Sequence, residues 1–285
     1  MDRSGGFHWR PFVYSSAVES EGRAYPIRFF VRGYPYRFFG VLPCERHIIG
    51  VDSGAVLFLL GSDLYGRDQL SRLLQGSRIS LAAAWAAAAL SLALGTISGA
   101  AAGYHGGWTD DLLMRAGEIC MSVPWLYLLL AGRAFLPLNI PPGAGYLVIA
   151  GLVGVLGWAR PARLIRGVVL AGREQGYVIA ARGFGATTGY LLRVHILPDA
   201  LSVAITQAML LLPHYIMAEV TLSFLGLGID EPASSWGNLL AAVQHYYVLS
   251  TYWWMLLPAI APILVCYCCF SIGDTLPGRR KPMPL

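Results

Sequence analysis

Charge is scarce in this chain, and lysine is almost absent. Only 13% of the 285 residues are Asp, Glu, Lys or Arg, whereas 56% are hydrophobic. A soluble domain carries roughly 25% charged residues. Lys281 is the single lysine, so arginine supplies nearly all of the positive charge behind a net charge of +5. This composition excludes an ordinary soluble domain and indicates a protein that has lipid as its solvent.

Several kinds of chemistry are excluded by what is missing. An ATP-binding loop of the Walker type needs a lysine directly after a glycine, but Lys281 follows two arginines. The six histidines form no HExxH pair. Cys266, Cys268 and Cys269 lie in an apolar run without paired metal-ligand spacing, and we interpret them as small buried thiols. We therefore expect no catalytic residue, no metal site and no cofactor in this chain.

Long apolar runs dominate what is present. Crossing about 30 Å of hydrocarbon takes roughly 20 helical residues. Residues 79–103 carry no charge, and their many Ala, Gly and Ser residues favour close helix–helix packing. Buried helices of a soluble protein are the alternative, but soluble cores rarely use several uncharged runs of this length. The runs that we expect to span the membrane are 79–103, 112–136, 143–159, 200–228 and 249–272.

The distribution of arginine predicts the orientation of these spans, because cytoplasmic loops are enriched in Lys and Arg. Residues 160–199 hold six arginines against two acidic residues, and the tail 277–285 adds three basic residues. The loop between the last two spans has Asp230 and Glu231 but no Lys or Arg. We therefore expect 160–199 and the tail to be cytoplasmic, and that loop to lie outside.

The N-terminal residues 1–78 fit this topology poorly. Counting back from the tail places them outside, yet they hold ten arginines against seven acidic residues. Either a helix that precedes them carries them outward, or they stay inside and one of the five spans is miscounted. We expect the first, with 1–78 as a partly irregular extracytoplasmic segment and 79–276 as the membrane domain.

A short polar bracket, "AARGFGATTGYLLRVHILPDA", interrupts the apolar sequence from Ala180 to Ala200. Positions 177, 180, 181 and 184 share one helical face. Gly185 can supply the left-handed conformation that ends a helix, and a threonine at 187 or 188 can cap the next. Pro198 suits the first turn of the following span. The spacing predicts a helix–turn–helix on the cytoplasmic surface, with a basic loop that only fixes topology as an equal alternative.

This bracket resembles the EAA loop of ABC-importer permeases, which in that family forms coupling helices that dock on the ATPase subunit. Two alanines, a glycine and a closing Leu-Pro recur at the same spacing, whereas Ile179 stands where the family has an acidic residue. The residues that the resemblance assigns to the ATPase contact are Ala180, Ala181, Arg182, Gly185, Ala186, Thr187, His195, Leu197 and Pro198.

Further motifs narrow the resemblance to the C-type permeases of dipeptide, oligopeptide and nickel importers. They are "LGSDLYGRDQLSRLLQGSRISL", "GYHGGWTDDLLMR", "SVPWL", "LSFLGLGIDEPASSWGNLL" and "GDTL", in order over residues 57–276. The resemblance implies an all-α polytopic membrane protein with the fold of a type I ABC importer transmembrane domain. About five spans are expected in this chain, because the family's first helix has no counterpart here.

The resemblance also implies a permease subunit that forms half of a translocation pathway for peptides or a related small solute. Its partners would be a second homologous permease, two ATP-binding subunits that hold ATP and magnesium, an extracytoplasmic solute-binding protein and the lipid bilayer, with no nucleic acid. The location implied is the cytoplasmic (inner) membrane of a bacterium or archaeon. Dipeptide, oligopeptide, nickel and oligosaccharide all stay open as cargo.

Two other function classes compete with this one. A secondary transporter has no use for a cytoplasmic docking loop, and a membrane-embedded enzyme needs clustered His, Asp or Glu, which the sequence lacks. The acidic residues inside the expected spans are Glu118 and Glu219, and such residues are functional candidates by default. A packing hydrogen bond to a neighbouring helix is the equal alternative for both.

Overall fold

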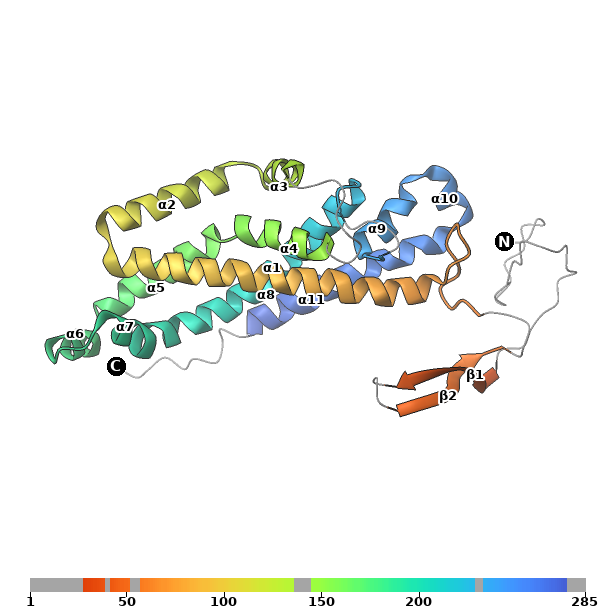
Figure 1. Cartoon of the computed structure of the whole chain (residues 1–285), viewed down its shortest axis with the longest axis horizontal. Helices are drawn as coiled ribbons and strands as arrows, with labels where there is room; N and C mark the ends of the chain where they lie inside the picture. The colour runs from red at the N-terminus through yellow and green to blue at the C-terminus, as the bar shows by residue number, and fades with distance from the viewer. Residues whose placement is uncertain (1–27, 39–41, 52–56, 136–144, 229–232, 276–285) are drawn as a thin grey trace, which may run out of the picture. The chain divides into compact units, whose positions relative to one another are not determined.

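The structure is a computed structural model that describes residues 28–38, 42–51, 57–135, 145–228 and 233–275. The chain folds as two compact units, Met1–Leu70 and Ser71–Leu285 (Figure 1). The first contains the only strands among the described residues, and the second is helical.

The N-terminal unit contains a hairpin that the sequence analysis did not anticipate. β1 (Arg28–Phe38) pairs antiparallel with β2 (Leu42–Gly50), so that Phe29 lies opposite Ile49. The pairing is irregular between Arg32 and Tyr36, where a proline in β1 has no N–H to donate to the ladder. The aromatic and β-branched residues of this stretch favour strands, which explains why the expectation of an all-α chain missed it.

The helix α1 (Gln69–His105) begins at Gln69 instead of at Ile79. The Asp68 Oδ1 atom accepts a hydrogen bond from the Leu70 N–H at 3.2 Å, which satisfies a donor that the first helical turn leaves free. The helix thus includes residues that the sequence analysis left in the N-terminal segment, because charges that precede an apolar run obscure where a helix starts.

Helices build the second unit, and α8 packs against α5, α9 and α11 (Figure 1). The elements after α1 are α2 (Gly107–Ser122), α3 (Trp125–Ala134), α4 (Gly145–Leu156), α5 (Ala159–Arg173), α6 (Gly176–Gly183), α7 (Thr188–Tyr190), the π-helical turn η1 (Leu191–Ile196), α8 (Leu197–Phe224), α9 (Trp236–Ala241), η2 (Ala242–Gln244), α10 (Tyr246–Thr251), η3 (Trp253–Ala259) and α11 (Ile260–Thr275).

Three continuous helical stretches are long and apolar enough to cross a bilayer: Gln69–His105, Thr188–Phe224 and Trp253–Thr275. Two bent pairs raise the number to five if each pair is one span. The first pair, α2 and α3, meets at 95° at Pro124, and the second, α4 and α5, meets at 47°. Proline disfavours a helical conformation at the residue before it and lacks its own N–H, so the run expected as one straight helix breaks there.

The arginine-rich segment expected as a loop from residue 160 is helical as far as Arg173. One face of α5 is buried, and α1 packs on it through glycines. A Cβ atom added to Gly99 would lie only 2.4 Å from the Ala162 carbonyl oxygen, and one at Gly103 would lie 2.8 Å from that of Arg166. The close helix packing predicted from the small residues of 79–103 is therefore confirmed.

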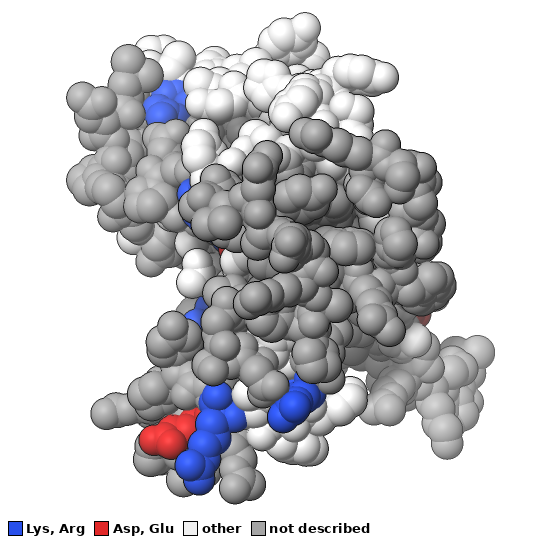
Figure 2. All heavy atoms as spheres, turned by 90° about the vertical axis from the view of Figure 1, so that its right-hand side faces the viewer, with Lys and Arg blue, Asp and Glu red and all other residues white. Residues whose placement is uncertain are grey.

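The main core joins α1 to α8 and α4. The Tyr215 hydroxyl donates to Ser91 Oγ at 2.6 Å, and Ser91 Oγ donates to the Gly154 carbonyl oxygen at 2.7 Å. On the face drawn in Figure 2, most of the described surface is uncharged (white), with charged side chains at a few places. This surface agrees with the low charge content of the sequence.

Candidate functional site

The coupling segment, residues 176–196, comprises α6, α7 and η1 and lies at the opposite end of the helical unit from α10 (Figure 1). Val178 is the only residue of α6 that is buried. Tyr177, Ile179 and Phe184 are exposed, and Phe184 is 93% exposed. The apolar face that the spacing predicted on α6 is therefore largely free in this chain, and most of it does not pack on the helical unit.

The predicted helix–turn–helix is confirmed, with one correction. Gly185 has a φ of +84°, in the left-handed region that glycine favours, and a Cβ atom there would meet open space. Pro198 lies in the first turn of α8, as expected. Thr187 occupies the N-cap position of α7, but its side chain makes no capping hydrogen bond. The turn therefore depends on the glycine more than on a threonine cap.

A groove of about 510 Å³ lies between α6 and the helix that follows. Small residues line much of it, and His195 stands between two tyrosines, with ring centroids 5.8 Å from Tyr177 and 5.7 Å from Tyr190. His195 belongs to the π-helical turn η1, a type of turn that is frequent at functional sites. The lining residues are Ala181, Phe184, Gly185, Ala186, Thr187, Tyr190 and His195.

Five of the nine residues assigned to the ATPase contact from the sequence line this groove. The other four are Ala180, Arg182, Leu197 and Pro198, of which Leu197 packs on a buried cluster of α5, α6 and η1. Phe184 and Tyr190 were missing from that assignment. Their signal was present in the sequence, because a large aromatic beside a glycine turn has little to pack against in its own chain.

Glu219 lies at the centre of a second polar site, the Glu219 cluster, formed with Ser80, Ser223 and Ser235. Its side chain is nearly inaccessible, and the whole residue is 1% exposed. Ser80 Oγ donates to Glu219 Oε2 and Ser223 Oγ donates to Glu219 Oε1, both at 2.8 Å. Ser235 Oγ lies 3.5 Å from Ser223 Oγ. The cluster therefore joins α1, α8 and the start of α9.

The cluster anchors α9, which folds back into the helical unit from the loop between α8 and α11. Ser235 caps α9 through a capping box with Asn238. The Trp236 N–H donates to Ser80 Oγ at 3.1 Å, and the indole Nε1 donates to Ser77 Oγ at the same distance. Trp236 itself is buried. The loop expected outside the membrane thus carries a short helix tied to α1 by hydrogen bonds.

Glu118 is in a different environment from Glu219. It lies on α2 with a side chain that is 48% exposed, 3.2 Å from Arg115 and 3.5 Å from Arg163. Exposed ion pairs of this kind contribute little to stability. Of the two acidic candidates, only Glu219 has the buried, fully hydrogen-bonded environment of a specialised group.

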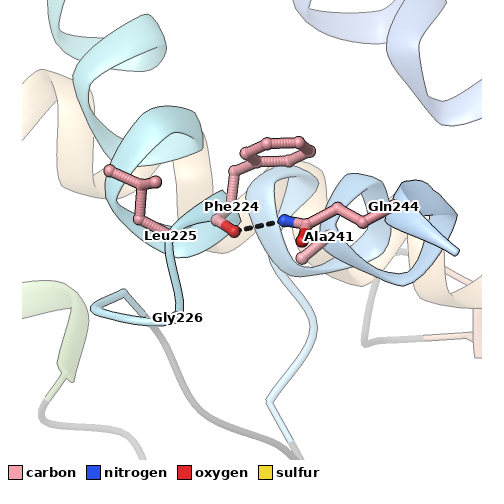
Figure 3. A pocket seen from close by; sticks show the side chains of 5 residues that line it. All are labelled: Phe224, Leu225, Gly226, Ala241 and Gln244. Atoms are coloured by element: carbon pink, nitrogen blue, oxygen red, sulfur yellow. Dashed lines mark hydrogen bonds between the residues drawn. The ribbon is translucent and has the colours of Figure 1, made fainter.

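A shallower groove of about 440 Å³ lies at the end of α8 (Figure 3). Gln244 donates a hydrogen bond from its side-chain nitrogen to the Phe224 carbonyl oxygen at 2.5 Å, and so ties η2 to this helix end. Leu225, Gly226 and Ala241 form the remaining walls. The groove is lined mainly by apolar groups, and the one polar side chain in it is already engaged.

Known proteins resemble this chain in both sequence and fold. Residues 91–281 match the family described as "Binding-protein-dependent transport system inner membrane component". The chain is 38% identical over 223 residues to the dipeptide transport system permease protein of Bacillus subtilis, covering 78% of this chain and 68% of that protein. It is 38% identical over 222 residues to the oligopeptide transport system permease protein of Escherichia coli, covering 78% and 71%.

Solved structures share the fold. A structure of the MetNI methionine ABC transporter in inward-facing conformations matches with a TM-score of 0.57 and 18% identity, over 74% of this chain and 98% of that one. An amino acid ABC transporter crystallised with histidines matches with a TM-score of 0.52 and 16% identity, over 73% and 92%. The expected fold of an ABC importer transmembrane domain is therefore confirmed.

The family match covers about two thirds of the chain, and the apolar helices provide three to five candidate membrane spans. Partner subunits, an ATPase among them, follow from such an importer in general. The chain therefore belongs to the family of binding-protein-dependent transport system inner membrane components and is a multi-pass permease subunit of an ABC importer.

Proposed function

We propose that this chain forms one half of the pathway of a peptide importer, in the cytoplasmic membrane of a bacterium or archaeon. A second, homologous permease would form the other half. Two ATPase subunits would bind the two permeases from the cytoplasm, and an extracytoplasmic solute-binding protein would deliver the cargo. The peptide class is supported by the names of the dipeptide and oligopeptide permeases that are 38% identical to this chain.

The exposed apolar face of the coupling segment is the observation that carries the docking proposal. Aromatic side chains at such exposure are costly in water, so Phe184 and Tyr177 favour burial against a partner. The small residues around Gly185 leave space for a partner's side chain to enter the groove. The arginine-rich segment that contains this face is expected on the cytoplasmic side, where the ATPase subunits would bind.

The mechanism that follows needs no nucleotide chemistry in this chain. Closure of the ATPase subunits on ATP would displace α6 and α7, and the helices joined to them would exchange an inward-open pathway for an outward-open one. The chain then supplies a two-state element that its partners bias, because a partner can shift an equilibrium only by binding one state more tightly.

Cross-linking from the exposed aromatic positions tests the docking surface and its sidedness together. In a chain without native cysteines, co-expressed with its partner subunits, we expect Phe184→Cys to cross-link to an ATPase subunit. Tyr246→Cys is the matched control, since Tyr246 is also an exposed aromatic but lies in α10, at the other end of the helical unit. Equal cross-linking from both positions, or ATPase subunits that fail to co-purify, would contradict the proposal.

The turn at Gly185 gives a second test with a matched substitution. We expect Gly185→Ala to lower peptide uptake about tenfold, because holding alanine in the left-handed conformation costs roughly 1–2 kcal/mol. Gly183→Ala should leave uptake unchanged, since Gly183 is exposed in α6 with no neighbour within 4 Å of an added Cβ and no positive φ. Uptake is measured at equal expression of the three chains. Similar uptake by both variants would show that the backbone of this turn does not matter.

A further inference from the structure

Two arginines of α5 hold the turn that joins α1 to α2. Arg166 donates from Nε and Nη2 to the two carboxylate oxygens of Asp110, the second at 2.5 Å. Arg173 Nη1 donates to the carbonyl oxygens of Gly103 and Tyr104 at 3.3 and 3.4 Å, and so caps the end of α1. Besides the orientation that they predict, these arginines therefore have contacts inside the fold.

A third arginine brings the coupling segment into the same set of contacts. Arg182, in α6, donates from Nη2 to the Tyr104 hydroxyl at 3.2 Å, and its guanidinium carbon lies 5.7 Å from the centroid of that ring. Tyr104 also packs against the buried cluster that contains Ile165 and Val178. The end of α1 thus contacts both α5 and α6.

These contacts matter because the chain connects the coupling segment directly only to α5 and α8. A displacement of α6 reaches α1 and α2 through side chains alone. The Arg166–Asp110 pair is the strongest candidate to carry it, because two parallel hydrogen bonds fix the orientation of both groups. Its side chains are 33% and 14% exposed, whereas the Arg115–Glu118 pair on the same α2 is 80% and 48% exposed.

We propose that Asp110 and Arg166 are positioning residues that make α2 move together with the coupling segment. A displacement of α6 then reaches the α1–α2 arm as well as α8, and the pathway changes on two sides at once. The proposal rests on the proposed docking of an ATPase subunit on the coupling segment. It assigns the carboxylate of Asp110 a task in energy coupling, without contact to nucleotide or cargo.

The ratio of peptide transported to ATP hydrolysed tests this role in the complete complex, reconstituted in proteoliposomes. We expect Asp110→Asn to lower the ratio at least tenfold while ATP hydrolysis stays within about twofold of the wild type. Arg115→Gln is the control on the same helix and should leave both quantities unchanged. A normal ratio in Asp110→Asn, or a parallel loss of hydrolysis and transport, would overturn the proposal, since a merely structural residue affects both alike.

A distance measurement gives an independent readout. Spin labels at Trp108→Cys on α2 and Ile179→Cys on α6, both at exposed positions, report whether the two helices move as one body. We expect the same label distance in the nucleotide-free and ATP-bound wild-type complexes, and a distance that changes between these states when Asp110→Asn is added. A distance that changes in the wild type would overturn the proposal. Absence of ATPase subunits from the wild-type preparation would instead contradict the docking proposal beneath it.

Discussion

Replacing Glu219 with alanine is expected to destabilise the chain by roughly 2–6 kcal/mol, whereas Glu118→Ala should cost less than about 1 kcal/mol. Alanine at 219 removes the acceptor of both Ser80 and Ser223, and each buried donor left without a partner costs about 1–3 kcal/mol. Glu118 has only exposed ion pairs, whose contribution is typically about 0–1 kcal/mol. The two substitutions delete the same atoms, so the difference reports the environment alone.

Unfolding of the purified chain in detergent measures both variants, and accessibility of α9 gives the local effect. We expect proteolysis or cysteine labelling near Trp236 to increase in Glu219→Ala, because the hydrogen bonds that tie α9 to α1 depend on this cluster. Glu219→Gln should fall between wild type and alanine, since the amide keeps the shape and one acceptor oxygen. Equal stabilities of the alanine variants at 118 and 219 would exclude a special role of the cluster.

The two glutamates mark a limit of reading the sequence alone. Both lie in expected spans, and nothing in their neighbours along the chain separates them. The difference arises because the loop after α8 turns back and places Ser235 and Trp236 against Ser80, more than 150 residues earlier. Contacts of such long range depend on how helices assemble, and periodicity carries no information about that.

The spans themselves could be predicted well, because hydrophobic length is a direct consequence of bilayer thickness. Their interruptions could not. Pro124 signals a break, but only the structure shows that α2 and α3 meet at 95°. The arginines of α5 resemble a loop in composition, yet their helix is stabilised by packing on α1 and by partners such as Asp110. The hairpin β1–β2 was missed because the low charge and long apolar runs of the chain point to helices only.

The candidate site was predicted in outline because the motif is local. Gly185 ends a helix by its own backbone freedom, and Pro198 begins one, so neighbouring residues were sufficient to place both. The exposed side chain of Phe184 was beyond such an argument. Whether an aromatic side chain is buried or free depends on α1 and α5, which lie elsewhere in the sequence.

The packing of α1 on α5 leads to the last prediction: Gly99→Leu is expected to separate these helices, at a cost of about 3 kcal/mol or more. A Cβ atom at this position would already lie 2.4 Å from the Ala162 carbonyl oxygen and 3.0 Å from Ile165 Cβ. Neither partner can move away freely, because one is backbone and the other is buried. Overpacking typically costs about 1–3 kcal/mol, and here the hydrogen bonds from α5 to the end of α1 are lost as well.

Gly151→Leu is the matched control for this substitution. Gly151 also lies in an apolar helix, α4, but no atom comes within 4 Å of an added Cβ atom, so leucine there should be tolerated in the isolated chain. Denaturation of both variants in detergent, with tryptophan fluorescence as the signal, gives the comparison. If Gly99→Leu unfolds at the same denaturant concentration as Gly151→Leu, then α1 and α5 do not depend on this close approach. A selective loss in Gly99→Leu would establish that the glycines of α1 hold together the helices on which the coupling segment is mounted.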